Sequence, residues 1–208
     1  MPSSCPKCHR VLDQDEICCA QVRYTWRCTQ CMKLCTGFAI PYGKCFLCGG
    51  KLEIIEGREL GDSMRFRAIR DAVQFELNSF HFYKLARDHA KTPEQRAVLD
   101  RLYEAELDHL HELEEKYHAH LDRETVELSA DQDKLLSNWL FQGIHVTEDS
   151  GIADLYKAAL EMEIRTRDHF LKLAAELPPG LEKDLCGELA AEEEEHVAML
   201  EGELEQLG

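Results

Sequence analysis

Residues 106–109 read Glu-Leu-Asp-His and residues 193–196 read Glu-Glu-Glu-His, so the pattern Glu-x-x-His occurs twice, 87 positions apart. Thirty positions before each copy lies a further glutamate, Glu76 in the first case and Glu163 in the second. Residues three apart on a helix share a face, so each pattern directs a carboxylate and an imidazole the same way. Two helices that carry Glu and two that carry Glu-x-x-His form the ligand set of a di-iron or di-manganese carboxylate bundle. The repeat therefore predicts a two-metal site.

The residues around these six predicted ligands support the interpretation, because in all four segments the acid lies within an apolar stripe of helical spacing. A buried, unpaired carboxylate is costly, and four that face one another would also repel. Two divalent cations would neutralise their four negative charges. One Glu-x-x-His in a chain rich in glutamate is weak evidence, but two in matching register are difficult to obtain by chance. The stripes are Ile69, Val73, Glu76, Phe80 and Tyr83; Leu99, Leu102, Glu106, His109 and Leu113; Tyr156, Ala159, Glu163, Thr166, Phe170 and Leu173; and Cys186, Leu189, Glu193, His196 and Leu200.

The N-terminal segment predicts a second kind of metal site, because nine of the ten cysteines lie in the first 48 residues. Two thiolates three residues apart bind one ion, and a second pair on another turn completes a tetrahedral set. A segment this short has little apolar core, so we expect a loop-and-ribbon module that is folded by its metal. The first Cys-x-x-Cys pair is Cys5 and Cys8, the second is Cys28 and Cys31, and the third is Cys45 and Cys48.

The sequence leaves the pairing of these cysteines open. In the preferred arrangement, the second and third pairs, separated by thirteen residues, hold one iron or zinc ion. The first pair would then hold a second thiolate-bound metal together with Cys18 or Cys19. In the alternative arrangement, the first and second pairs form the site across nineteen residues. The third pair would then need partners among Cys18, Cys19 and Cys35.

Composition and charge narrow the range of partners. The 208 residues, of which 44% are hydrophobic, allow one domain with a packed core and a second, small one. The net charge of −16 is divided into +4 over residues 1–51 and −20 over the remainder, which argues against nucleic acid as a partner. No apolar run approaches the ~20 residues of a bilayer span, and no secretion signal is recognisable. We therefore expect a cytoplasmic protein without a membrane partner.

The helical pattern predicts an all-α domain over residues 63–208, joined by a link at 52–62 to the cysteine module at 1–51. The first helix is expected at 63–90, and Thr92-Pro93-Glu94-Gln95 is a capping box that begins the second, which fades near residue 120. A long connection follows, with a short helix after Ser129 and an apolar group at 139–141. The third helix begins near 151 and ends before Pro178, and the fourth fills most of the remainder. Short, long and short connections indicate a ferritin-like four-helix bundle with one long crossover.

These features together resemble the rubrerythrin family, in which a di-metal bundle is joined to a small four-cysteine module. The resemblance covers nearly all of the chain from residue 24 onward. In the helices it rests on Glu76 followed by Tyr83 and Lys84-Leu85-Ala86, and on residues 159–163 followed by Phe170 and Lys172-Leu173-Ala174. In the module, residues 26–31 and 45–50 resemble the two knuckles of a rubredoxin-like iron site.

The resemblance implies roles for the matching residues and a reaction. Rubrerythrins reduce hydrogen peroxide at a di-iron pair, with electrons passing through the rubredoxin-like iron. The chain would then be a non-haem di-iron oxidoreductase that reduces peroxide or activates dioxygen, served by an electron-donor protein and active as a homodimer. The bundle would hold two iron ions, or manganese or zinc. Its catalytic residues would be the terminal ligands Glu76 and Glu163, the bridging ligands Glu106 and Glu193, and the single ligands His109 and His196.

A second candidate function uses the same metal-binding bundle but involves no catalytic turnover. In this alternative, the chain is a ferritin-like iron-binding or ferroxidase protein whose cysteine module holds a structural zinc ion. The third helix of the family commonly carries a further glutamate three residues after the first, and Thr166 occupies that position here. The visible spectrum of the cysteine module distinguishes the two functions, because iron held by thiolates is coloured and zinc is not.

Overall fold

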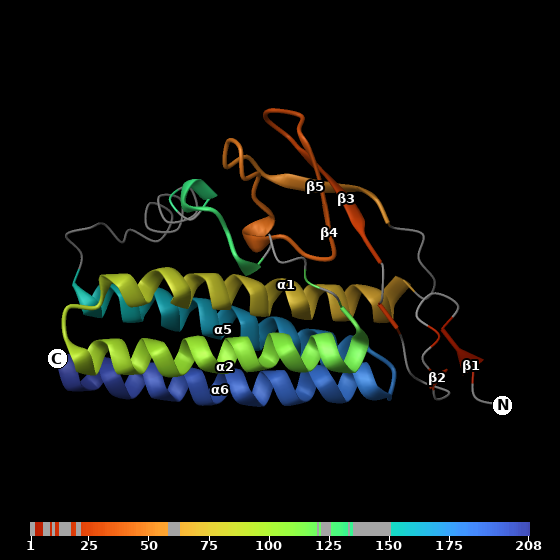
Figure 1. The fold of residues 1–208 in the computed structure, drawn as a ribbon. Helices are drawn as coiled ribbons and strands as arrows, with labels where there is room; N and C mark the ends of the chain where they lie inside the picture. Colours follow the sequence, from red (N-terminus) through yellow and green to blue (C-terminus); the bar gives the residue numbers. More distant parts are fainter. Residues whose placement is uncertain are drawn as a thin grey trace.

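The computed structural model consists mainly of four long helices that lie side by side (Figure 1). It describes residues 3–5, 9, 11–12, 18–19, 22–57, 63–119, 121, 126–132, 134 and 151–208. A small three-stranded sheet from the N-terminal part of the chain lies against one side of the helices. The helices are α1 (Ser63–Ala86), α2 (Pro93–Tyr117), α5 (Ile152–Glu176) and α6 (Leu181–Leu207).

The connections between these helices are short, long and short, in the predicted order. Helix α1 continues into one 3-10 turn, η2 (Arg87–His89), before α2 begins, and α5 and α6 are separated only by residues 177–180. Residues 118–151 connect α2 to α5, and these two helices run in the same direction (Figure 1). The predicted short helix after Ser129 is helical at 130–132. The predicted apolar group at 139–141 lies outside the described residues.

The predicted start of α2 is confirmed by its capping box. The Thr92 hydroxyl accepts a hydrogen bond from the backbone N–H of Gln95 at 3.3 Å, and Gln95 Oε1 accepts one from the backbone N–H of Thr92 at 3.3 Å. Both bonds satisfy donors that the first helical turn leaves without partners. The end of α1 was predicted near residue 90, but the regular helix stops at Ala86, because the chain tightens there into η2.

The four predicted apolar stripes are buried between the helices. Every residue of the first, second and fourth stripes is buried, and in the third only Leu173 is partly exposed. The stripes supply about half of the buried helical residues in the two main core clusters. Because the glutamates lie within the stripes, this packing carries their carboxylates into the interior. None of the described helices is both long and apolar enough to cross a membrane.

The cysteine module is built on an antiparallel sheet in which the middle strand, β3, pairs with both others. Residues 52–56, expected to belong to the link, instead form β5, whose Leu52 is buried and pairs with Cys28. Along β3, Tyr24, Trp26 and Cys28 alternate onto one buried face, as the two-residue period of a strand requires. The strands of this sheet are β3 (Tyr24–Cys28), β4 (Leu34–Gly37) and β5 (Leu52–Glu56), and a separate two-stranded sheet contains β1 (Ser3–Ser4) and β2 (Val11–Leu12).

A set of polar contacts, here called the clasp, fastens the module to α1. The clasp joins the 3-10 turn η1 (Pro41–Gly43) and the residue before it to two side chains of α1. Gln74 accepts from the backbone N–H of Ile40 at 3.0 Å and donates to the Ile40 carbonyl at 2.5 Å. Asn78 Oδ1 accepts from the backbone N–H of Tyr42 at 2.5 Å, and the Tyr42 hydroxyl donates to the Asn78 carbonyl at 2.7 Å. The clasp therefore contacts α1 at one residue before Glu76 and at one residue after it in the sequence.

Replacement of Thr92 by alanine tests the capping box. The variant loses the acceptor for the Gln95 N–H, so we expect the free energy of unfolding to fall by about 1 kcal/mol. Chemical denaturation followed by circular dichroism measures this loss. Lys91→Ala changes the exposed neighbouring side chain without removing a cap, and serves as the control. Equal stability of the two variants would contradict the assignment.

Candidate metal centres

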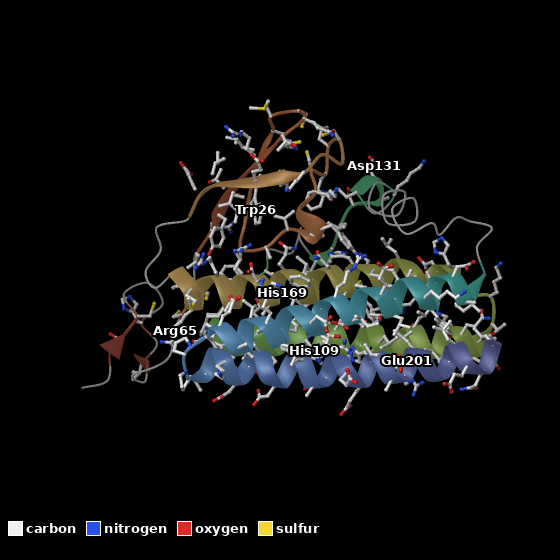
Figure 2. The ribbon with its side chains drawn as sticks, turned by 180° about the vertical axis from the view of Figure 1, so that it is seen from behind. Trp26, Arg65, His109, Asp131, His169 and Glu201 are labelled. Carbon is white, nitrogen blue, oxygen red and sulfur yellow. The ribbon has the colours of Figure 1, made fainter. Side chains whose placement is uncertain are left out.

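The six predicted bundle ligands meet in the interior of the four helices. Figure 2 shows His109 among the helices of the bundle, away from the sheet that carries Trp26. All four glutamate side chains are fully buried, and the two histidines are 8% and 6% exposed. Helix α1 supplies Glu76, α2 supplies Glu106 and His109, α5 supplies Glu163, and α6 supplies Glu193 and His196.

The six residues form two overlapping groups, and the ligand atoms within each group lie within 4.8 Å of one another. The first group contains Glu76 and His109, and the second contains Glu163 and His196. Glu106 and Glu193 belong to both groups. Two carboxylates shared between two histidine-containing groups are the arrangement that two neighbouring cations with two bridging ligands would need.

The imidazole nitrogens face the carboxylates at short range. His109 Nδ1 lies 2.9 Å from Glu76 Oε2 and 3.7 Å from Glu106 Oε2. His196 Nδ1 lies 3.1 Å from Glu193 Oε2 and 3.3 Å from Glu106 Oε1. The two rings are stacked, with centroids 5.8 Å apart. Both histidines therefore present the same nitrogen, Nδ1, to the middle of the cluster.

The protein alone does not hold four negative charges here. Burial raises the pKa of Glu76 to about 8 and raises the pKa values of Glu163 and Glu193 well above their ordinary range. Burial would also raise the pKa of Glu106, but the neighbouring imidazoles of His109 and His196 outweigh this effect and lower that pKa to about 2. Without cations, protons must therefore neutralise part of the cluster. Divalent cations would perform the same neutralisation and leave every carboxylate free to bind.

The cluster also has unused ligand atoms. Five buried carboxylate oxygens have no hydrogen-bond partner: Oε1 of Glu76, both oxygens of Glu106, Oε2 of Glu163 and Oε1 of Glu193. Buried polar atoms are normally paired, and a bound cation would satisfy these five. Carboxylates with imidazoles are ligands for iron, manganese and zinc. The cluster can therefore hold metal ions, and its chemistry fits two divalent ones.

Two contacts just outside the cluster were not predicted from the sequence. The hydroxyl of Tyr83, which is fully buried on α1, donates a hydrogen bond to Glu163 Oε1. On the other side of the cluster, His109 Nε2 lies 3.1 Å from Glu192 Oε2. Such outer partners orient metal ligands and tune their basicity. Glu192 gave no signal in the sequence, because it belongs to a run of four glutamates.

Thr166 supplies no ligand to the cluster. Its hydroxyl donates to the backbone carbonyl of Met162 at 3.1 Å, one turn earlier in α5. A threonine in the middle of a helix commonly bonds back in this way. The buried Thr166 side chain therefore completes the packing of the stripe and leaves the cluster with six ligands.

The structure brings together the second and third cysteine pairs of the module. Their four sulfur atoms lie within 4.8 Å of one another, with Cys28 and Cys48 3.6 Å apart and Cys31 and Cys45 also 3.6 Å apart. This group can hold one metal ion. Of the proposed second thiolate site, Cys8 lies outside the described residues. Within the part of the chain that the structure describes, no metal-ligand group includes Cys5, Cys18 or Cys19.

Backbone N–H groups point at two of these sulfur atoms, and at Cys28 they favour the thiolate. The N–H groups of Cys31 and Gln30 approach Cys28 Sγ at 3.5 and 3.4 Å, and that of Leu47 approaches Cys45 Sγ at 3.4 Å. Hydrogen bonds from Cys31 and Gln30 lower the pKa of the Cys28 thiol to about 6, against the opposing effect of its burial. The thiolate is the form that binds metal, so the loop favours the binding state.

Backbone conformation around the four-cysteine group depends on unusual residues. The residue after each pair adopts a left-handed conformation, with φ of 61° at Met32 and 71° at Gly49. Glycine adopts this conformation easily, but methionine does so at a cost. Next in the chain, Gly50 leaves room for sulfur, because a Cβ there would lie 2.8 Å from Cys28 Sγ. The site therefore requires glycine at 50 and tolerates strain at 32.

Fold and geometry together define a mostly helical protein with a buried glutamate–histidine cluster and a small sheet that carries four clustered cysteines, both able to hold metal ions. Comparison with models of known protein families, with curated proteins and with solved structures finds no match. The chemistry of the two clusters is therefore argued from their own residues.

Removal of a shared carboxylate tests the bundle cluster. We expect Glu106→Ala or Glu193→Ala to lose bound metal and to keep the helices folded, because each change deletes a ligand of both groups and removes a buried charge. Elemental analysis and circular dichroism measure the two properties. The matched control is Glu104→Ala, an exposed change on α2 that should retain the metal. Full metal content in both cluster variants would sink the assignment.

Replacement of Gly50 by alanine tests the four-cysteine group separately. The added methyl group would collide with Cys28 Sγ, so metal should be lost from the module and retained in the bundle. Metal content and thiol accessibility, compared between the two sites, measure the effect. Gly187→Ala, on α6 where an added Cβ meets nothing within 4 Å, is the control and should keep both metals.

Proposed function

We propose that the chain is a non-haem di-iron oxidoreductase of rubrerythrin type, which reduces hydrogen peroxide or activates dioxygen. Its helices would form a ferritin-like bundle around the two irons, and electrons would reach them through one iron held by the four cysteines. The observation that carries this proposal is the pair of overlapping ligand groups that share Glu106 and Glu193. A single-metal site or a buried ion-pair network would not require two shared carboxylates and two equivalent histidines.

The two clusters differ in the chemistry that they suit. Reduction of hydrogen peroxide to two molecules of water consumes two electrons and two protons. Iron in the bundle would supply the redox chemistry that this step needs. The glutamates would hold the pair of ions against their mutual repulsion, and the buried surroundings would limit the access of water. The four thiols would hold an ion that carries one electron at a time.

Electrons would come from a donor protein that binds at the outer side of the four-cysteine group. Cys31 and Cys48 are exposed, whereas Cys28 and Cys45 are fully buried. Large apolar side chains accompany the exposed pair in the sequence: Met32, Leu34 and Leu47 are 59%, 56% and 66% exposed. Exposed apolar groups of this size favour contact with a protein partner.

Electrons would leave the module at its inner side, towards α1. The buried Cys28 and Cys45 belong to the same apolar cluster as Ile69 and Val73 of α1. The clasp then joins the turn before Cys45 to Gln74 and Asn78 of α1, which lie two positions before and two positions after Glu76. This contact supports transfer within one chain, because it holds the module directly against the helix that supplies the first ligand.

A ferritin-like iron-binding or ferroxidase protein with a structural zinc module is the second candidate. The observation that favours it is Thr166, whose hydroxyl is committed to the backbone of α5 where the family commonly has a seventh, carboxylate ligand. In this case the module would recruit a partner and carry no electrons. The bundle would bind and oxidise iron without a sustained peroxidase cycle.

The visible spectrum of purified protein tests the proposal. We expect the absorption of iron held by thiolates, which is bleached by a reductant under anaerobic conditions and restored by hydrogen peroxide. A colourless module that contains zinc, in a protein that still binds iron in the bundle, would overturn the electron-transfer function and favour the second candidate. Metal analysis of the same sample identifies the ions.

Replacement of Cys28 by serine tests the relay. The variant loses one thiolate of the module and none of the bundle ligands, so iron in the bundle should remain. Steady-state peroxide reduction with a protein donor should slow, because the iron of the module would keep only three of its four thiolate ligands. Cys186→Ser, which changes a buried thiol outside both clusters, is the control. An unchanged rate in Cys28→Ser would end the relay hypothesis.

A further inference from the structure

The internal repeat allows each half of the bundle cluster to be compared with the other. Positions 87 apart are counterparts, so Glu76 corresponds to Glu163 and His109 corresponds to His196. A perfect repeat would give two equivalent metal positions. Two departures from the repeat lie in direct contact with the ligands, one at the position of Glu76 and His109 and one at the position of Glu163 and His196. This inference rests on the proposed two-metal function.

The first departure concerns the outer nitrogens of the histidines. Glu192, which precedes the shared ligand on α6, places a carboxylate oxygen 3.1 Å from His109 Nε2. Its counterpart is Ala105, which precedes the shared ligand on α2 and has no polar side-chain atom. The repeat therefore gives His196 no equivalent of the Glu192 carboxylate. Of the two histidines, only His109 therefore has its outer nitrogen, Nε2, next to a carboxylate at this position of the repeat.

The second departure concerns the terminal glutamates. The Tyr83 hydroxyl donates a hydrogen bond to Glu163 Oε1. The counterpart of Tyr83 is Phe170, which is equally buried but has no hydroxyl to offer Glu76. Of the two terminal glutamates, only Glu163 therefore accepts a hydrogen bond from the aromatic residue at this position of the repeat.

Both departures act in the same direction on metal affinity. A carboxylate behind a ligating histidine fixes the tautomer that presents Nδ1 and raises the donor strength of the ring. Glu192 does this for the position of Glu76 and His109. A hydrogen bond to a ligating carboxylate stabilises its charge and so weakens it as a donor. Tyr83 does this at the position of Glu163 and His196.

We propose that the two metal positions are unequal: the position of Glu76 and His109 binds a divalent cation more tightly than the position of Glu163 and His196. The tight position fills first, and the weak position loads and releases the second ion. A protein with one ion bound is therefore a defined state of the cluster. The exchangeable ion is the one beside Tyr83.

Titration with Mn²⁺ tests this order of filling. The four-cysteine group is first filled with zinc, and the full-length protein is freed of metal in the bundle. We expect the first Mn²⁺ to bind at least roughly tenfold more tightly than the second, which is the lower end of the effect of an outer carboxylate. Equilibrium dialysis measures both affinities. Electron paramagnetic resonance at one equivalent should show isolated Mn²⁺, with the signal of a coupled pair only as the second equivalent is added.

Variants assign the difference to the two departures. Glu192→Gln keeps the size of the side chain and removes its charge, so the first affinity should fall roughly 10- to 100-fold. Tyr83→Phe should instead raise the affinity for the second Mn²⁺ and so reduce the difference between the two affinities. Glu195→Gln, an exposed change on the same helix, is the control and should leave both affinities unchanged. Circular dichroism establishes that each variant is folded before titration.

The outcomes separate this inference from the function on which it rests. Two equal affinities in the native chain, or unchanged affinities in folded Glu192→Gln, overturn the inequality while the two-metal cluster stands. Failure of the bundle to bind Mn²⁺, or binding that is unaffected by Glu106→Ala, overturns the two-metal function itself. Unequal affinities that respond to Glu192→Gln and Tyr83→Phe support the inequality.

Discussion

Four carboxylates in a dry helical interior are the constraint on which the structure depends. Each glutamate lies in the middle of an apolar stripe, so the packing that removes the stripe from water also removes the charge. The free-energy cost of burying these charges is reduced only where the four helices bring the glutamates close to the two histidines. The short connections after α1 and α5 make each pair antiparallel, and the long one returns the chain so that the pairs can face each other.

The cysteine module meets the same problem of buried charge by different means. Cys28 and Cys45 lie at the start of tight loops whose backbone N–H groups point at sulfur, and at Cys28 the peptide backbone itself stabilises the thiolate. A helix cannot do this in its interior, because its N–H groups are already used in the helical ladder. In the bundle, the neighbouring imidazoles, together with protons or cations that the cluster can bind, must therefore provide the compensation.

Much of this arrangement could be predicted from the sequence, because helical spacing converts directly into shared faces. The buried stripes, the Thr92 cap and the grouping of Glu106 with Glu193 all depend on local periodicity and on the repeat. Contacts between elements could not be predicted in this way. Glu192 looks like its exposed neighbours in sequence, and only the approach of α6 to α2 brings it to His109.

The departures within the module have similar causes. Residues 52–56 were expected in a link because Glu and Gly are frequent there, but pairing with β3 overrides that composition. The clasp depends on Gln74 and Asn78, two polar residues of a helix that become informative only when the turn at Tyr42 is placed against them. Local patterns thus predict elements and their faces, whereas tertiary contacts determine which polar side chains meet.

The four-cysteine group has unequal sides, with Cys31 and Cys48 open to solvent and Cys28 and Cys45 sealed against the core of the module and α1. An ion held there would be accessible to solvent on the side of Cys31 and Cys48 and shielded from it on the side of Cys28 and Cys45. Small polar molecules could reach the ion only from the solvent-exposed side, so dissolved oxidants would approach it from solvent and not from the bundle. The fold would thus determine the side from which a dissolved oxidant reaches an ion in the module.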